Sequence, residues 1–329
     1  MRATDRHFSE LSTLLRPVAG ELEAVRACMA ETLGAAPWPA GDHLARLDMG
    51  GGKMLRPALT LLSGQSLGST RNEHITLGAV VEMIHLASLL HDDVIDQAHT
   101  RRGTASANVL WGNTQAVLLG DFVLSKAFGM AATLDVSQAA EVLCQTAEAI
   151  CTGEMQQNLR KGDPTLTESD YLAIIEGKTA SLFGACCCLG ALASQAEPDL
   201  CEHLRRYGVA LGMAFQMTDD LLDILGCSDR EGKTLGTDLL NEKLTLPVIA
   251  WLREGDRSRR QAEFDRFVER SDCQALRGVI GQSEAVDYTL GRAEAFARSA
   301  RQSLSPLPDT SAKTALLGLV DYVLARAAR

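Results

Sequence analysis

The sequence predicts an all-α protein, and three observations lead to that fold class. Apolar residues recur at helical spacing from residue 10 onward, only nine prolines occur among 329 residues, and no alternating run makes a convincing strand. Hydrophobic residues make up 46% of the chain, which is ample for a core, and no change in composition marks a boundary. We therefore predict one helical domain over residues 1–329, with ligands that converge on a central cavity.

The N-terminal part is expected to form two helices separated by a break. Apolar positions from Glu10 to Leu33 follow one helical stripe, and a proline- and glycine-rich stretch at 36–41 ends it. A short helix at 44–47 then leads to three glycines at 50–52. The stripe predicts packing against the body of the protein or against a second subunit.

Lys53 and Arg56 lie three residues apart at the start of the next predicted helix, which runs through residues 58–62. Backbone N–H groups and the helix dipole favour an anion at such a position. Taken alone, the two cations could equally be solvated side chains on a loop.

A long apolar helix from Ile75 to Ile95 ends in Asp92, Asp93 and Asp96. Their spacing places Asp92 and Asp96 on one helix face with Asp93 beside them. Three clustered carboxylates repel one another and require a neutralising cation. Arg101 and Arg102 follow a short way downstream.

The arrangement recurs at Asp219, Asp220 and Asp223, inside a second apolar helix that also carries Gln216. Oxygen ligands with no Cys or His nearby suit Mg²⁺, which proteins hold through one or two carboxylates and substrate phosphates. One acidic triplet is often a solvated helix face. Two copies, each in an apolar helix, favour a clamp around one diphosphate.

The remaining segments also have helical patterns. Residues 106–130 predict a helix interrupted near Gly112 and Gly120, residues 139–160 predict another, and residues 167–170 contain a capping signal for the next. The stretch from Glu176 to Ala180 is similar to the tail of a Walker A loop. The earlier glycine and the preceding strand of that motif are missing, so a P-loop is excluded.

Composition limits the function and the location. The formal charge of −10 excludes a nucleic-acid surface and a general attraction to anionic lipid, so an anionic substrate needs a local basic cluster. Nine cysteines without metal-ligand spacing are typical of a reduced, cytoplasmic protein, and Cys186–Cys188 are interpreted as core residues. No leader and no stretch of about 20 uncharged apolar residues is apparent, which predicts a soluble chain.

From Gly50 to Arg329 the chain resembles the trans-polyprenyl diphosphate synthases. The resemblance rests on Asp92-Asp93-Val94-Ile95-Asp96 with Arg101-Arg102-Gly103, on Asp219-Asp220-Leu221-Leu222-Asp223, and on a GGKxxRP motif that ends at Pro57. It implies the isoprenoid-synthase helical bundle, a homodimer, and Mg²⁺ as the cofactor. It also implies two substrates, isopentenyl diphosphate and an allylic diphosphate.

The resemblance further implies a role for each matching residue. The six aspartates are implied to hold metal, and together with Lys178 they form the implied catalytic set. Substrate diphosphates are implied to be bound by Lys53, Arg56, His85, Arg101, Arg102, Lys178, Thr179, Gln216, Lys233 and Lys243. Two positions depart from the family pattern: Met54 replaces a frequent basic residue, and Glu242 stands where glycine is usual.

Product length is expected to depend on the helix that carries the first aspartates. Ser88 and Ala87 lie about one turn before Asp92 and are small, whereas an aromatic residue there would block a growing chain. Met83, Ile84 and Leu143 are the residues expected near the floor of the cavity. These positions favour a hexaprenyl to decaprenyl product for quinones, passed on to a membrane, although small residues could also simply allow close helix packing.

Three other functions share part of this sequence pattern. A short-chain farnesyl or geranylgeranyl synthase has the same chemistry with a shallower pocket. A terpene cyclase has no use for a second diphosphate site, so Lys53, Arg56 and Arg102 count against it. A non-catalytic partner subunit would be expected to lose aspartates, and all six are present.

Overall fold

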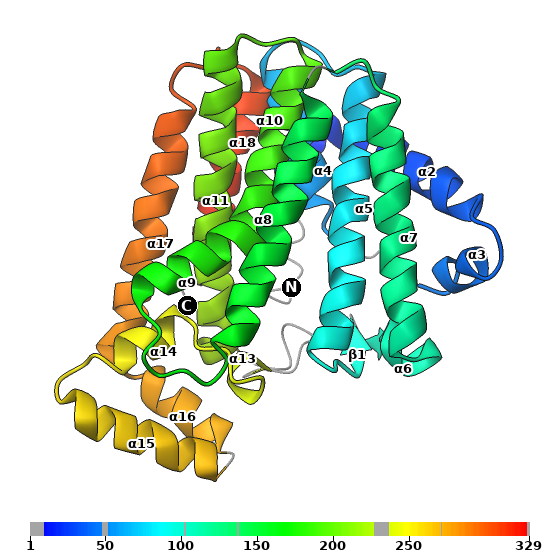
Figure 1. Cartoon of the computed structure of the whole chain (residues 1–329). Coiled ribbons are helices and arrows are strands. Elements are labelled where there is room, and N and C mark those ends of the chain that lie inside the picture. Colours follow the sequence, from blue (N-terminus) through cyan, green and yellow to red (C-terminus); the bar gives the residue numbers. More distant parts are fainter. Residues whose placement is uncertain are drawn as a thin grey trace.

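The structure, a computed structural model, describes residues 10–47, 52–101, 103–136, 138–226, 237–270 and 272–327. Long helices lie side by side and form a bundle (Figure 1), which confirms the all-α prediction. The bundle helices are α4 (Leu55–Ser66), α5 (Asn72–Ile95), α7 (Asn113–Ala132), α8 (Ala139–Leu159), α10 (Ser181–Ala193), α11 (Pro198–Leu225), α17 (Glu284–Ser303) and α18 (Ser311–Ala325).

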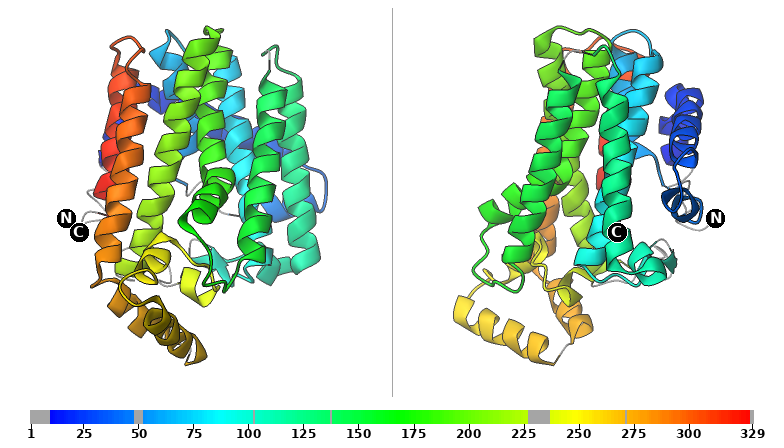
Figure 2. Two further views of the ribbon diagram at one scale, coloured as in Figure 1. Left: turned by 60° about the vertical axis from the view of Figure 1, so that its left-hand side comes forward. Right: turned by 45° about the vertical axis from the view of Figure 1, so that its right-hand side comes forward.

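The N-terminal segment lies outside the bundle (Figure 2). The predicted continuous helix is interrupted by the 3₁₀ turn η1 (Arg16–Val18), because Pro17 cannot donate a backbone hydrogen bond. It continues as α2 (Ala19–Gly34), which packs against α5. The short helix predicted at 44–47 is wrong in position: α3 (Ala40–Leu44) begins inside the predicted break, and residues 45–47 form a turn.

The structure differs from the prediction at two places near Gly112: residues 100–105 and Gly120. A small antiparallel hairpin, β1 (Thr100–Arg101) and β2 (Thr104–Ala105), forms where no strand was expected. Gly112, with a φ of 83°, does separate α6 (Ala107–Trp111) from α7. Gly120, in contrast, lies inside α7 without interrupting it. An added Cβ at Gly120 would lie 2.3 Å from the His91 ring, so this glycine allows α5 and α7 to approach closely.

The middle of the chain passes through α9 (Glu168–Ile175), the π-helical turn η2 (Glu176–Ala180) and α10 without a break. The predicted cap at the start of α9 is present, since the Thr167 hydroxyl accepts a hydrogen bond from the Asp170 backbone N–H. Cys186–Cys188 are buried in α10, as interpreted. Burial raises the pKa of Cys186 to about 12 and that of Cys188 to about 11.

Two hydrophobic clusters form the core. The larger one involves α2, α4, α5, α7, α10 and α18, and the smaller one involves α9 and the helices α14 (Leu246–Trp251) and α16 (Cys273–Ile280), while α11 contributes to both. Phe296 and Leu324 pack against both clusters. The helix α15 (Arg257–Glu269) lies with α16 at the lower end in Figure 1. The single domain over residues 1–329 stays a prediction from the sequence.

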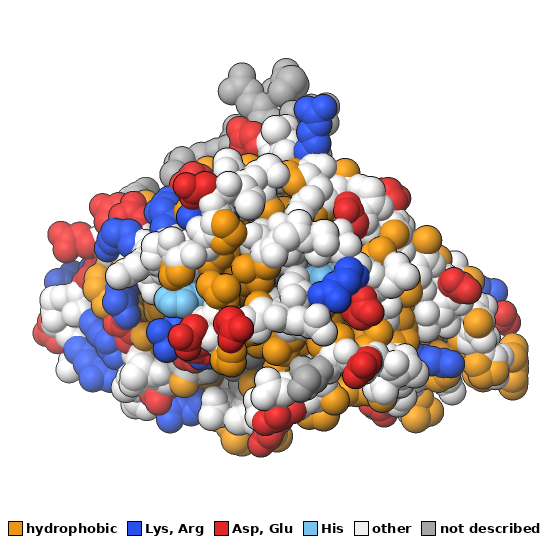
Figure 3. Space-filling model, turned by 90° about the horizontal axis from the view of Figure 1, so that it is seen from above, with side chains coloured by type: hydrophobic (Ala, Val, Ile, Leu, Met, Phe, Trp, Pro, Cys, Tyr) orange, Lys and Arg blue, Asp and Glu red, His pale blue; other side chains and the backbone are white. Residues whose placement is uncertain are grey.

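Three helical segments are long and apolar enough by length and composition to cross a membrane, although each contains charged residues: Asn72–Ile95, Asn113–Ala132 and Glu168–Ala193. Their most apolar windows are 61%, 33% and 67% buried inside the protein, respectively. The first and third are therefore core helices, whereas α7 exposes much of its surface. Seen from the end opposite the aspartates, hydrophobic side chains lie between charged ones (Figure 3).

Candidate active site

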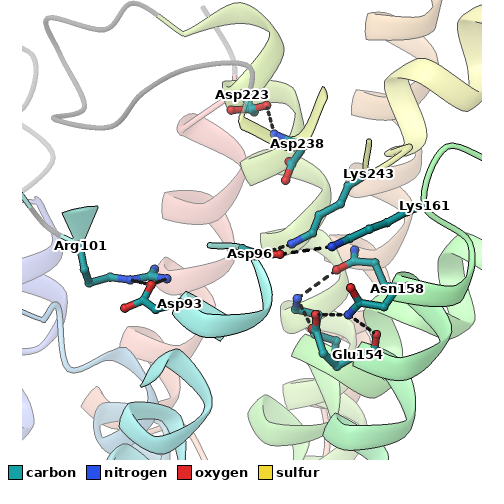
Figure 4. Close-up of polar contacts among 11 residues, drawn as sticks. Asp93, Asp96, Arg101, Glu154, Asn158, Lys161, Asp223, Asp238 and Lys243 are labelled. Carbon is teal, nitrogen blue, oxygen red and sulfur yellow. Dashed lines mark hydrogen bonds and ion pairs between the residues drawn. The ribbon is translucent and has the colours of Figure 1, made fainter. Parts of the chain in front are cut away.

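The two aspartate motifs lie at the same end of the bundle. Asp92 and Asp93 occupy the last turn of α5 and Asp96 is its C-cap, while the second motif occupies the last turns of α11. Lys243 Nζ donates a hydrogen bond to Asp96 Oδ2 at 2.6 Å (Figure 4). The Lys243 backbone N–H donates to the Asp238 oxygen at 2.7 Å, and the Asp238 N–H donates to Asp223 Oδ2, so this segment connects the two motifs. The prediction that both clusters serve one site is consistent with this geometry.

Asp93 is used differently from its neighbours. Its carboxylate is buried, and its Oδ1 accepts hydrogen bonds from Arg101 Nε at 2.9 Å and from Arg101 Nη2 at 2.5 Å. Figure 4 shows this pair on the far side of Asp96 from Lys243. Asp93 therefore anchors the β1–β2 hairpin to α5, and Arg101 is committed to this aspartate.

Asp92 is the most available oxygen donor of the first motif. Among the residues that the structure describes, none makes a hydrogen bond or ion pair with its carboxylate. Burial raises the pKa of Asp92 to about 6; Lys178 opposes this shift, and Glu154 and Asp96 add to it. A cation entering here would remove this unfavourable charge.

Asp96 lies between two lysines. In addition to Lys243, Lys161 approaches it, with Nζ 3.7 Å from Oδ1. Lys243 is itself buried, although it carries a charge. Close by, in α13 (Thr237–Leu240), the Asp238 backbone N–H donates to Asp223 Oδ2 at 3.3 Å. Burial first, and Asp223 second, raise the pKa of Asp238 to about 7.

The second motif is largely occupied by protein partners. Asp220 is buried and accepts hydrogen bonds from the Tyr171 hydroxyl at 2.5 Å and from Gln216 Nε2 at 2.8 Å. Gln216 in turn accepts a hydrogen bond from the Thr179 hydroxyl at 2.9 Å. Burial, with Asp238 nearby, raises the pKa of Asp220 well above its ordinary value, although the hydrogen bonds oppose the shift.

Asp219 is paired with a residue from the last helix. Arg326 Nη2 donates to Asp219 Oδ1 at 2.6 Å, and the guanidinium lies 4.5 Å from the centre of the Phe215 ring. The Arg326 side chain is only 11% exposed. The end of α18 therefore neutralises one carboxylate of the second motif.

Lys178 projects from η2 toward the first motif. Its ammonium forms an ion pair with Glu154 on α8 and donates to Gln157 Oε1 at 3.0 Å. Burial alone would lower the pKa of Lys178, but Asp92 and Glu154 together raise it above the ordinary value. The ammonium is therefore charged, as a role in binding an anion requires.

A second basic region lies where α4 meets α18. Lys53 Nζ donates to the Tyr322 hydroxyl at 3.3 Å, and the Arg56 guanidinium lies 5.0 Å from the centre of the Phe183 ring. The buried Nε of Arg56 has no hydrogen-bond partner within the described parts of the chain. His85 is half-buried on α5, two turns before Asp92. Arg102 and Lys233 lie outside the described residues.

The residues expected to set product length are distributed over two environments. Four of them belong to the larger buried cluster, with exposed fractions of at most 3%: Met83, Ile84, Ala87 and Leu143. Ser88 is half-buried, and its hydroxyl donates to the backbone oxygen of His85 at 2.8 Å. The structure therefore places Ser88 with the polar face of α5 and Ala87 with the core.

The donor chemistry fits a hard divalent cation. All six motif residues offer oxygen only, and Asp92 has an open carboxylate in a region where the negative charge is poorly solvated. Within the described ranges, no three His, Cys, Asp or Glu residues are arranged to hold a metal by themselves. A metal bound by one or two carboxylates and completed by substrate phosphates agrees with both observations.

Sequence reasoning missed several residues at the site: Glu154, Gln157, Asn158, Lys161, Tyr171, Asp238, Tyr322 and Arg326. Glu154 and Asn158 share a helix face at i, i+4 spacing, which could have drawn attention to them. Tyr171 and Arg326 carry no local signal, because their partners lie 49 and 107 residues away in the chain.

Comparisons with known proteins agree with this geometry. The model of the polyprenyl synthetase family matches residues 42–277, which include both aspartate motifs. The chain is 38% identical to octaprenyl diphosphate synthase of Escherichia coli over 281 residues, covering 84% of this chain and 87% of that protein. It is also 38% identical to nonaprenyl diphosphate synthase of Mycobacterium tuberculosis over 293 residues, covering 87% and 86%, respectively.

Solved structures agree in fold. A polyprenyl synthase of Caulobacter crescentus, crystallised with calcium and isoprenyl diphosphate, superimposes with a TM-score of 0.90 at 34% identity, covering 97% of this chain and 98% of that one. A decaprenyl diphosphate synthase of Rhodobacter capsulatus gives a TM-score of 0.90 at 35% identity, covering 97% and 100%. With the paired aspartate motifs and the lysines between them, these matches show that the chain belongs to the polyprenyl synthetase family and is a trans-prenyltransferase.

Proposed function

We propose that the protein condenses isopentenyl diphosphate head-to-tail with an allylic diphosphate, with Mg²⁺ as cofactor, and makes medium- or long-chain all-trans polyprenyl diphosphates. The observation that supports this proposal most strongly is the position of Lys178 and Lys243 between the two acidic motifs, where the Asp92 carboxylate has no partner among the described residues. Such a site suits a diphosphate bound through metal. The separate basic pair Lys53 and Arg56 suits a second diphosphate bound directly.

The site residues have separate roles in the proposed reaction. Lys178 and Lys243 bind the allylic diphosphate and stabilise the charge that grows on it as it departs. Asp92, Asp96 and Asp223 are the carboxylates placed to hold Mg²⁺, which when bound adds Lewis-acid stabilisation to the same leaving group. Lys53 and Arg56 orient isopentenyl diphosphate so that its double bond attacks the allylic carbon.

Product length is supported by the relatives. The two curated relatives described above are octaprenyl and nonaprenyl synthases at 38% identity, whereas a geranylgeranyl diphosphate synthase of Methanosarcina mazei is 33% identical. Ala87 and Ser88 are small, so neither side chain would obstruct a product that grows along α5 beside the first motif. An octaprenyl-like product in the hexaprenyl to decaprenyl range, used for a quinone side chain, is the proposed outcome.

A homodimer is proposed from the exposed apolar face of α7 and α8, which pack on each other. Val117 and Leu118 on α7 are 39% and 55% exposed, and Met155 and Leu159 on α8 are 59% and 84% exposed. Exposed apolar surface on neighbouring long helices is typical of a subunit interface.

Light scattering tests the dimer directly. Leu118→Lys should convert the dimer to a monomer, while Ser299→Lys on the distant helix α17 adds the same charge and should leave the dimer intact. A wild-type protein that is monomeric at micromolar concentration would refute the proposal.

We place the enzyme in the cytoplasm, with the product released to a membrane.

The function is tested by incubating purified protein with farnesyl diphosphate, radiolabelled isopentenyl diphosphate and Mg²⁺, and then separating the dephosphorylated products. A ladder ending between hexaprenyl and decaprenyl supports the proposal. A ladder ending at geranylgeranyl overturns the length and identifies a short-chain synthase. No incorporation with either farnesyl or geranyl starter contradicts the activity.

A further inference from the structure

Two glycines bring α8 and the π-turn η2 into direct backbone contact. An added Cβ at Gly153 would lie 2.6 Å from the backbone nitrogen of Lys178 and 3.0 Å from the Ile174 oxygen. An added Cβ at Gly177 would lie 2.9 Å from the Ala149 oxygen. Side chains larger than hydrogen would separate the two elements. The next residue on each element, Glu154 or Lys178, is thereby brought against the other.

Glu154 is held on both carboxylate oxygens. Its Oε1 accepts a hydrogen bond from Asn158 Nδ2 at 2.9 Å, and its Oε2 is buried and pairs with the Lys178 ammonium (Figure 4). The residue is 7% exposed. Burial of a carboxylate is costly unless it is paired and hydrogen-bonded, so this arrangement fixes both partners tightly.

The Lys178 ammonium has a second anionic neighbour that it does not reach. Asp92 and Lys178 interact electrostatically, yet no ion pair within 4.0 Å joins these two described residues. Instead the ammonium is retained by Glu154 and by Gln157 Oε1. The Asp92 carboxylate, which could also pair with this ammonium, is therefore left without an ion pair among the described residues.

We propose that Glu154 is a positioning residue that holds the Lys178 ammonium away from Asp92, so that Asp92 remains available to metal and Lys178 remains directed at the allylic diphosphate. This inference rests on the proposed function, in which Lys178 binds that substrate. The Gly153–Gly177 contact is the backbone feature that sets the position. Asn158 fixes the carboxylate from the other side.

A simpler alternative makes the opposite prediction. If Glu154 is only an additional negative charge near an anionic substrate, its neutralisation should tighten diphosphate binding. If Glu154 positions Lys178, neutralisation should weaken binding, because the lysine is then free to pair with Asp92. Glu154→Gln distinguishes the two, since glutamine keeps the shape and an oxygen acceptor while removing the charge.

The experiment measures binding of the unreactive analogue farnesyl S-thiolodiphosphate by calorimetry, in the presence of Mg²⁺. Glu154→Gln should weaken binding about tenfold, a typical size for loss of a residue that orients a ligand-binding group. The KM for isopentenyl diphosphate should change less than about twofold, since Lys53 and Arg56 are untouched. Glu176→Gln, an exposed carboxylate on the same π-turn, should match wild type.

A double-mutant cycle shows whether Glu154 acts through Lys178. Glu154→Gln/Lys178→Gln should bind the analogue no more weakly than Lys178→Gln alone, because there is then no ammonium to position. Tighter binding by Glu154→Gln, or losses that multiply in the double variant, would overturn the inference. Unchanged binding by Lys178→Gln would instead refute the role of Lys178 in the proposed function. Glu154→Asp, which keeps the charge on a shorter side chain, should bind the analogue more tightly than Glu154→Gln and less tightly than wild type.

Discussion

The two aspartate motifs have the same sequence pattern but different surroundings. At the first motif, Asp92 has an open carboxylate and Asp96 meets two lysines, Lys243 and Lys161. At the second, Asp220 is bound by Tyr171 and Gln216, and Asp219 is bound by Arg326. One motif is therefore prepared to receive a cation, whereas the other is already stabilised by the protein around it.

The middle residue of each motif serves the scaffold. Asp93 holds the hairpin through Arg101, and Asp220 links α11 to α9 through Tyr171. The outer residues differ: Asp92 is open, Asp96 meets two lysines, and Asp219 is paired with Arg326. The DDxxD pattern thus combines structural and chemical roles, and substitutions at different positions should have different kinds of effect.

The largest expected effect is on catalysis at the first motif. Asp92→Asn should reduce kcat by about 10²-fold or more, because the open metal-binding carboxylate is lost. The melting temperature of the metal-free protein should not fall. Steady-state kinetics and thermal melts check both statements, with Asp199→Asn at the distant start of α11 as the control. Full activity in Asp92→Asn would show that the open carboxylate is not the metal ligand.

At the second motif, we expect a substitution to lower the free energy of unfolding. Tyr171→Phe leaves the buried Asp220 carboxylate without its hydroxyl donor, which should cost about 1–3 kcal/mol of the free energy of unfolding. Tyr288→Phe is the matched control, because its hydroxyl contacts Glu168 at an exposed position and should matter little. Urea unfolding measures the difference. Equal effects of the two substitutions would contradict the contrast between buried and exposed donors.

A smaller effect is expected where Arg326 competes with metal. Arg326→Gln removes the cation that neutralises Asp219, so the metal-free protein should bind Mn²⁺ more tightly, by about three- to tenfold. Titration followed by electron paramagnetic resonance, without diphosphate, measures this affinity. Asp92→Asn should shift the affinity in the opposite direction. Unchanged Mn²⁺ binding in Arg326→Gln would show that the arginine and the metal do not compete.

A further expected effect is a dependence of stability on pH at the first motif. The pKa of Asp92 rises from 3.8 to about 6 on folding, so the folded protein binds this proton more tightly than the unfolded chain. Wild type should therefore lose stability relative to Asp92→Asn as the pH rises through that window, and the difference should level off above it. Thermal melts of both proteins in EDTA between pH 4 and 7 test this. A difference independent of pH would contradict the raised pKa.

Several features were determined by the sequence alone. Helical periodicity, the paired aspartates and the scarcity of strand patterns predicted the all-α bundle and the site residues on α5 and α11, because side-chain spacing along a helix is a local property. The capping signal at Thr167 and the core position of Cys186–Cys188 were predicted for the same reason. The helix break at Gly112 is equally local.

Other features depended on tertiary structure, because they arise from partners distant in the chain. Gly120 appeared to be a break, yet it is a contact point for His91. Arg326 reaches Asp219, and Tyr171 reaches Asp220, only because α18 and α9 pack beside α11. The sequence shows six equivalent aspartates. Burial and the pairing of charges across helices are what leave Asp92 open and occupy the others, and these are properties of the packed bundle rather than of any one segment.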